Sequence, residues 1–185
     1  ASKHLFHISK YLGASGHEVI ILCTKGESQS EPFSWQPNVK VIPILNFKQP
    51  FPGPYNISPG DLAYIAETVS AYLSKADRFY MHDGELLLPF LHNDIPTVIS
   101  YRDNTYPESI LGSFISAADA IIAVSDYSAS VLRATMGRLF PDIQGRIKVI
   151  NNGIDPGQFY EKSYKELLPL IPIDPIADRI ILHPH

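Results

Sequence analysis

Ala120-Ile121-Ile122-Ala123-Val124-Ser125-Asp126 is the stretch that decides the fold, because an unbroken apolar run stops there at a serine and an aspartate. Continuous apolar character over a few residues is typical of a parallel strand covered on both faces. Residues 126–139 then bring Val131 and Leu132 to one helical face, and serine is a common residue before the first turn of a helix. The stretch therefore predicts a strand that leads directly into a helix.

The same alternation of strand and helix patterns continues on both sides of this stretch. Apolar runs predict further strands at 18–24, 39–44, 78–82, 97–101 and 147–150. Helical spacing predicts helices before Gly13 and at 62–73, 86–91 and 110–118, while the proline-rich segment 46–60 predicts a long loop. Such alternation predicts an α/β fold with a doubly wound, Rossmann-like parallel sheet and helices on both faces.

The two ends of the sequence suggest how the domain is bounded. A doubly wound sheet usually begins with a central strand, whereas this sequence begins with a helix pattern, so we expect a first strand before Ala1. The periodicity fades after Asn151, and prolines interrupt the segment that follows. We therefore predict an N-terminal domain at 1–160, with a linker and the start of a second domain at 161–185.

Composition narrows the class of protein. The 185 residues carry a formal net charge of -4, and the basic residues are scattered, which disfavours a nucleic-acid partner. The single cysteine, Cys23, excludes an internal disulfide framework, and no apolar run approaches the roughly 20 residues of a membrane span. These features predict a cytoplasmic protein and leave open a peripheral position at the inner face of a membrane.

Three segments together resemble a known family. They are Leu12-Gly13-Ala14-Ser15-Gly16-His17-Glu18-Val19, then Ala117-Ala118-Asp119-Ala120-Ile121-Ile122-Ala123-Val124-Ser125, and finally Ile147-Lys148-Val149-Ile150-Asn151-Asn152-Gly153-Ile154-Asp155 with Phe159. In order and spacing they are similar to the N-terminal half of family 4 glycosyltransferases with the GT-B fold. The similarity covers nearly the whole chain.

This resemblance implies transfer of a sugar, with retention, from a UDP- or GDP-linked nucleotide sugar to an acceptor held by this domain. The acceptor class stays open among glycans, lipid-linked molecules and small metabolites, and neither a metal nor a further cofactor is expected. The family's pair of catalytic glutamates belongs to its second domain and has no counterpart here, so we expect this part of the enzyme to be inactive alone. Asn151, Asn152 and Gly153 would lie near the hinge between the domains.

Candidate acceptor-binding residues follow the predicted strands. His82 and Asp83 lie at the carboxyl end of one strand, and Arg102, Asp103 and Asn104 follow the next. Ligands bind beyond the carboxyl ends of strands in this fold. Where the resembled family often has a histidine facing the transferred sugar, this sequence has Arg102. An arginine suits phosphate or carboxylate groups and cannot act as a general base.

Ser125 is a further candidate at the same edge, although it could serve only as a helix cap. Two other classes of function stay open: a Rossmann-like binding module without transferase activity, and a nucleotide-sugar epimerase with the GT-B fold. A pure scaffold is a third option, suggested by Arg102 alone. The sequence lacks Gly-x-Gly-x-x-Gly, a Gly-Lys-Ser/Thr loop and Gly-x-Ser-x-Gly, which disfavours dehydrogenases, P-loop enzymes and α/β-hydrolases.

Overall fold

The computed structural model describes residues 2–26, 30–45, 58–82, 89–102, 118–153 and 156–158. The chain divides into two units, Ala1–Asn151 and Asn152–His185. Of the second unit, only residues 152–153 and a short 3-10 turn at Pro156–Gln158 are described. The helix predicted at 110–118 falls almost wholly outside the described residues.

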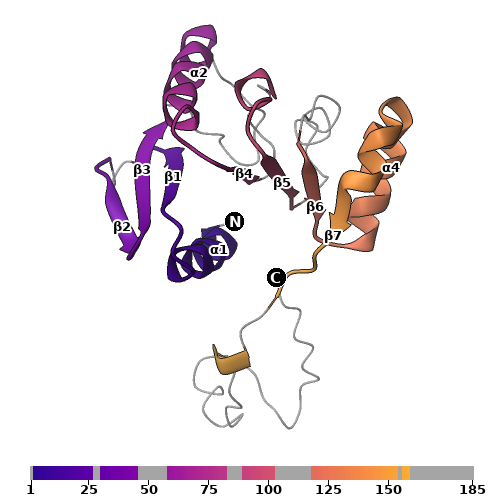
Figure 1. Ribbon diagram of the computed structural model, residues 1–185, viewed down its shortest axis with the longest axis horizontal. Coiled ribbons are helices and arrows are strands. Elements are labelled where there is room, and N and C mark those ends of the chain that lie inside the picture. The colour runs from indigo at the N-terminus through magenta and orange to yellow at the C-terminus, as the bar shows by residue number, and fades with distance from the viewer. Residues whose placement is uncertain are drawn as a thin grey trace, which may run out of the picture. The chain divides into compact units, whose positions relative to one another are not determined.

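A four-stranded parallel sheet forms the second half of the first unit (Figure 1). It is built from β4 (Phe79–His82), β5 (Thr97–Tyr101), β6 (Ala120–Ala123) and β7 (Ile147–Val149), in that order. All three neighbouring pairs are parallel. Helix α4 (Asp126–Leu139) follows β6 and packs beside β7, as Figure 1 shows. The predicted parallel α/β architecture is confirmed.

The core of this half lies between the sheet and α4. Met81, Ile99, Ile121 and Ile147 form one row across the four strands. They pack with α4 side chains, among which Met136 is fully buried. Burying such a side chain contributes roughly 1.5–3 kcal/mol, so this row and its helix form a strong link between neighbouring strands.

A separate three-stranded sheet forms the first half, with the order β1-β3-β2. Its strands are β1 (Val19–Thr24), β2 (Phe33–Gln36) and β3 (Val39–Leu45). β1 and β3 are parallel, but β2 runs antiparallel to β3 through a tight turn in which Asn38 has a φ of 63°. Two details of the sheet differ from the prediction: β2 was not predicted and runs antiparallel to its neighbour, and the described strands form two sheets.

Helices cover both faces of the first sheet. On one face, Leu5 of α1 (Ser2–Ala14) packs near Ile21 of β1, and Phe6 meets Trp35 of β2 with 5.5 Å between ring centroids. On the other face, α2 (Pro59–Leu73) buries Ile65, Val69 and Leu73. This arrangement fits the prediction of helices on both faces.

Local chemistry explains where these helices begin and end. The Ser58 hydroxyl oxygen accepts a hydrogen bond from the Asp61 backbone N–H over 3.1 Å and thereby caps α2. After α1, Gly16 has a φ of 88°, a conformation that glycine adopts without steric cost, and the chain turns into β1. Of the short helix predicted at 86–91, the described part is a 3-10 turn at Pro89–Leu91.

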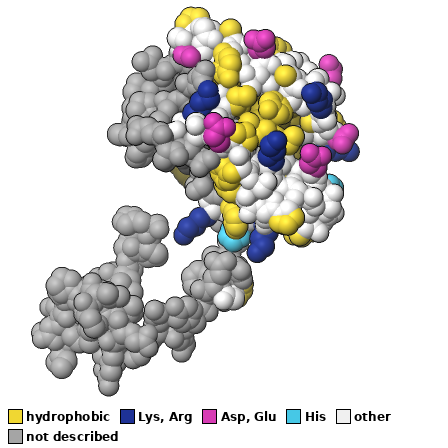
Figure 2. All heavy atoms as spheres, turned by 90° about the vertical axis from the view of Figure 1, so that its left-hand side faces the viewer, with side chains coloured by type: hydrophobic (Ala, Val, Ile, Leu, Met, Phe, Trp, Pro, Cys, Tyr) yellow, Lys and Arg dark blue, Asp and Glu magenta, His cyan; other side chains and the backbone are white. Residues whose placement is uncertain are grey.

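On the face shown in Figure 2, basic and acidic side chains alternate around a strip of apolar ones. In the part of the chain that the structure describes, every helix is too short or too polar to span a lipid bilayer.

Candidate functional site

Two of the predicted site residues lie at the carboxyl ends of neighbouring strands. His82 is the last residue of β4, and Arg102 follows directly after β5. Because His82 pairs in register with Ser100, the β4 and β5 strands end at the same edge of the sheet. In doubly wound folds ligands bind outside this edge, so the strand order places both side chains where a ligand is expected.

The imidazole of His82 lies beside Tyr80 and His4. The Tyr80 hydroxyl lies 3.3 Å from Nδ1 of His82, a contact between alternate residues of the same strand. The ring of His4, from the first turn of α1, lies 5.8 Å from the His82 ring, centroid to centroid. Residues from α1 and β4 therefore meet at one edge.

His4 is a site residue that sequence reasoning missed. Its position directly before Leu5, the first residue of the predicted apolar helix face, carried no signal of function. The pattern alone does not show which strand ends lie beside the start of the helix. A histidine in the first turn of a helix gains significance only when the helix is known to begin at the ligand-binding edge of the sheet.

Electrostatics at this edge favour uncharged imidazoles. Burial lowers the pKa of His82 to about 4, and the neighbouring Arg102 and His4 act in the same direction. Burial also lowers the pKa of His4, again with help from Arg102. At neutral pH His82 is therefore a neutral group that can donate or accept a hydrogen bond, beside the permanently charged guanidinium of Arg102.

Ser125 acts as the N-cap of α4. Its hydroxyl oxygen accepts a hydrogen bond from the Ser128 backbone N–H over 3.1 Å, and the hydroxyl donates to Oγ of Ser128 over 3.1 Å. Ser125 comes shortly after the end of β6, whose Ala123 pairs with Tyr101 of β5. The residue thus has a structural task, at the same edge of the sheet as the other candidates.

The other predicted residues fall into two groups. Asp83, Asp103 and Asn104 lie outside the described residues. Asn151, Asn152 and Gly153 are exposed and follow β7, and the boundary between the two units falls between Asn151 and Asn152.

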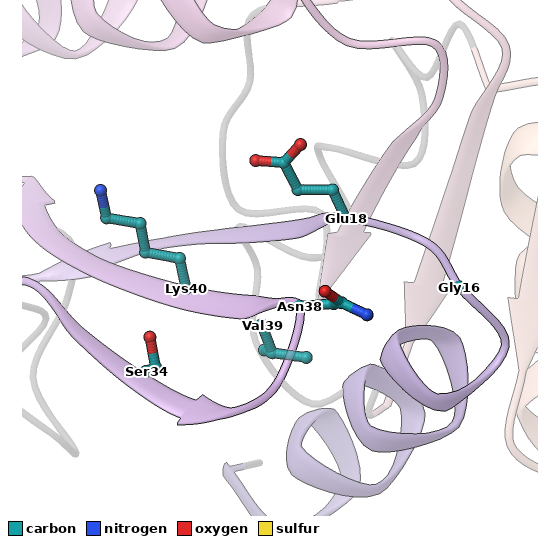
Figure 3. Close-up of a pocket in the computed structure, with 6 residues that line it drawn as sticks. All are labelled: Gly16, Glu18, Ser34, Asn38, Val39 and Lys40. Carbon is teal, nitrogen blue, oxygen red and sulfur yellow. The ribbon is translucent and has the colours of Figure 1, made fainter.

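A shallow pocket of about 250 Å³ lies elsewhere, at the amino ends of β1 and β3 (Figure 3). Its lining residues are Gly16, Glu18, Ser34, Asn38, Val39 and Lys40. Asn38 is engaged in the turn structure: its carbonyl accepts from the Val19 N–H over 2.8 Å, and its side-chain amide donates to the Gly13 carbonyl over 3.3 Å. This pocket is a hollow between two turns at the edge opposite to His82 and Arg102.

The buried histidine that precedes β5, His92, has a structural role. His92 is 3% exposed, and its Nδ1 lies 3.2 Å from Oγ1 of Thr97. The Thr97 hydroxyl donates to the Ile95 carbonyl over 2.8 Å, so Nδ1 of His92 must carry the hydrogen and donate to Thr97. Burial lowers the pKa of His92, against smaller opposing effects that include the charge of Asp119. The neutral ring braces the loop that enters β5.

Comparison with known proteins identifies the family. No curated protein and no solved structure gives a significant match to the chain. The family model described as Glycosyltransferase Family 4 matches residues 1–158, a span that contains every helix and strand described above. The family model covers most of the chain, and the parallel α/β fold agrees with it. The chain therefore belongs to glycosyltransferase family 4.

Proposed function

We propose that this chain is the acceptor-side domain of an enzyme that transfers a sugar, with retention, from a UDP- or GDP-linked nucleotide sugar to an acceptor. The acceptor would be a glycan, a lipid-linked molecule or a small metabolite. The observation that supports this role is the convergence of His4, His82 and Arg102 at the carboxyl edge of β4 and β5. A family 4 glycosyltransferase domain needs polar groups at this edge if it is to orient an acceptor there.

In this proposal Arg102 and His82 have different tasks. The guanidinium of Arg102 stays charged at every physiological pH and offers paired N–H donors to a phosphate or carboxylate group. That group would belong to an acidic acceptor or to the donor diphosphate. The neutral imidazole of His82 would hydrogen-bond an acceptor hydroxyl, since its pKa of about 4 keeps it uncharged during turnover. Asp83, Asp103 and Asn104 are proposed to complete the acceptor side, and Ser125 to line it while capping α4.

The remaining chemistry is assigned to a second domain. There, a pair of glutamates, basic side chains and helix N-termini would stabilise the negative charge that grows on the leaving diphosphate. We place the domain boundary near residue 160, with 161–185 as linker and start of the second domain. Asn151, Asn152 and Gly153 would then lie close to the hinge on which the two domains close over the donor. The reaction as proposed uses no metal ion or further cofactor.

The test compares Arg102→Ala with Arg102→Lys in the full-length enzyme. Loss of a charge-assisted hydrogen bond costs about 1.5–3 kcal/mol, so kcat/KM for the acceptor should fall roughly 10- to 150-fold in Arg102→Ala. Arg102→Lys should recover part of this loss, because the charge returns without the paired donors. Arg133→Ala, which removes an exposed arginine of α4, is the matched control and should leave turnover unchanged.

Two results would contradict the proposal. If Arg102→Ala leaves kcat and the acceptor KM unchanged, Arg102 is not part of the acceptor side. If the full-length enzyme interconverts a nucleotide sugar without any acceptor, the reaction is an epimerisation and the proposed transferase activity is wrong.

A further inference from the structure

The outward face of α1 carries basic and aromatic side chains. The helix packs on the first sheet through residues such as Leu5, which leaves its other side uncovered by any described element (Figure 1). That side exposes Lys3, His7, Lys10 and Tyr11, of which Tyr11 is 74% exposed. With 3.6 residues per turn, the four positions fall within about 100° of the helix circumference. They therefore form one continuous surface, here called the basic stripe.

Acidic side chains are missing from α1 and from the strands that it contacts. α1 packs on β1, β2 and β3, and none of these four elements contains an aspartate or a glutamate. The first acidic residue of the sequence is Glu18, beyond the carboxyl end of α1. The whole chain, by contrast, has a formal net charge of -4. The basic stripe is therefore a local positive surface on an acidic protein, and it suits an anionic ligand.

The basic stripe begins at the candidate site. Its first member, Lys3, directly precedes His4, whose ring lies 5.8 Å from the ring of His82. The stripe then runs away from the site along the helix, and Lys10 lies about 10 Å from Lys3 at 1.5 Å per residue. A ligand whose end reaches His82 can therefore continue over the stripe, provided that the ligand is extended.

The chemistry of the stripe favours a glycan over two other anionic partners. An amphipathic helix that lies on a membrane presents a broad apolar face to the lipid, whereas the apolar face of α1 is buried against the first sheet. A nucleic-acid site normally has many more basic groups, in a protein of basic character. A charged glycan needs only a few cations, and the amphipathic ring of Tyr11 can pack on the apolar face of a sugar ring.

We propose that the acceptor is a polyanionic glycan, with carboxylate or phosphate groups along its chain, and that the basic stripe binds the part of it remote from the reacting hydroxyl. This inference rests on the proposed acceptor role of the domain and selects one of the acceptor classes left open above. Lys3 and Lys10 pair with successive acidic groups of the glycan, and Tyr11 packs on a sugar ring between them. Binding energy from this remote part of the acceptor then helps to orient the reacting end beside His82.

Two oligosaccharides of equal length and linkage test the proposal by direct binding to the full-length enzyme. The anionic probe is the α-1,4-linked hexasaccharide of galacturonic acid, and the neutral probe is maltohexaose, the α-1,4-linked hexasaccharide of glucose. In NMR titrations the anionic probe should shift the backbone amides of Lys3, His7 and Lys10, while the neutral probe should leave them in place. Added salt should weaken the binding of the anionic probe, because exposed charges are screened.

Two double variants identify the surface that binds. Each exposed ion pair contributes a factor of about 1.4 to 5 in affinity, so Lys3→Gln with Lys10→Gln should weaken binding of the anionic probe about 2- to 30-fold. The matched control is Lys40→Gln with Lys75→Gln, which removes the same charge from two exposed lysines away from the outward face of α1. This control should bind the probe as the wild type does.

The proposal is overturned if the two hexasaccharides bind equally, if neither binds, or if the two double variants lose the same affinity. It is also overturned if Lys3 and Lys10 hold the enzyme on vesicles of anionic phospholipid while the anionic hexasaccharide fails to bind, since the stripe then faces a membrane. None of these results touches the transferase activity. Failure of the proposed function would show differently, as an enzyme that releases no UDP or GDP from any nucleotide sugar although its stripe still binds the anionic probe.

Discussion

Protonation of His82 is expected to destabilise the protein. Its pKa falls from 6.5 to about 4 because the ring is partly buried and lies near Arg102 and His4. When the folded state holds a histidine in its neutral form, the resulting stability is complete above pH 6.5 and is lost as the pH falls toward 4. At about 1.4 kcal/mol per pH unit, the loss amounts to at most about 3.5 kcal/mol. Since the ring is only partly buried, screening by water reduces this to about 2 kcal/mol.

The assay combines a titration with unfolding measurements. An NMR titration should find that the His82 ring takes up its proton well below pH 6. Urea unfolding at pH 7.5 and pH 4.5 should show that His82→Asn loses about 2 kcal/mol less on acidification than the wild type does. Comparison of the two proteins cancels the contributions of His4 and His92, whose pKa values are also lowered.

A second variant separates the causes of the pKa shift. Arg102→Gln removes the neighbouring charge but leaves the burial, which is the larger cause, so the pKa of His82 should rise and still remain below 6.5. A His82 ring that titrates near 6.5 in the wild type, or equal acid losses in wild type and His82→Asn, would refute this reasoning.

Three further predictions concern stability and can be checked by chemical or thermal unfolding. Ser125→Ala should cost about 1 kcal/mol by removing the cap of α4, while Ser125→Asn should retain most of it; equal losses would contradict the capping role. Gly13→Ala should cost about 1–3 kcal/mol, since its Cβ would lie 2.9 Å from Val39, whereas Gly60→Ala, with 3.8 Å to its nearest neighbour, should be harmless. Asp119→Ala should cost about 1.5–3 kcal/mol, because its carboxylate accepts the first N–H of β5 over 2.8 Å; Asp119→Asn should be milder.

The strands that sequence reasoning placed best are those with clear ends. The prediction for 97–101 matches β5, and that for 120–124 differs from β6 by one residue. The run 120–124 is wholly apolar and Ser125 marks where α4 begins, while 97–101 is rich in β-branched and aromatic residues and is bounded by Pro96 and Arg102. The edge location of His82 and Arg102 followed from these strand ends, because the carboxyl ends of parallel strands meet at one edge.

The features that were missed had no clear signal in the sequence. β2 has only four residues, and its apolar side chains Phe33 and Trp35 alternate with polar ones between two prolines. Its pairing with β3 follows from a turn at Asn38, a non-glycine residue at positive φ. His4 escaped notice for a different reason: its contact with His82 joins two elements far apart in the sequence.

The most direct test of the account is the fate of a nucleotide sugar incubated with the full-length enzyme and candidate acceptors. The account predicts release of UDP or GDP that depends on the acceptor, with the sugar keeping its anomeric configuration in the product when examined by NMR. Sugar transfer with inversion, or a full-length protein that neither binds nor consumes any UDP- or GDP-linked sugar, would contradict it.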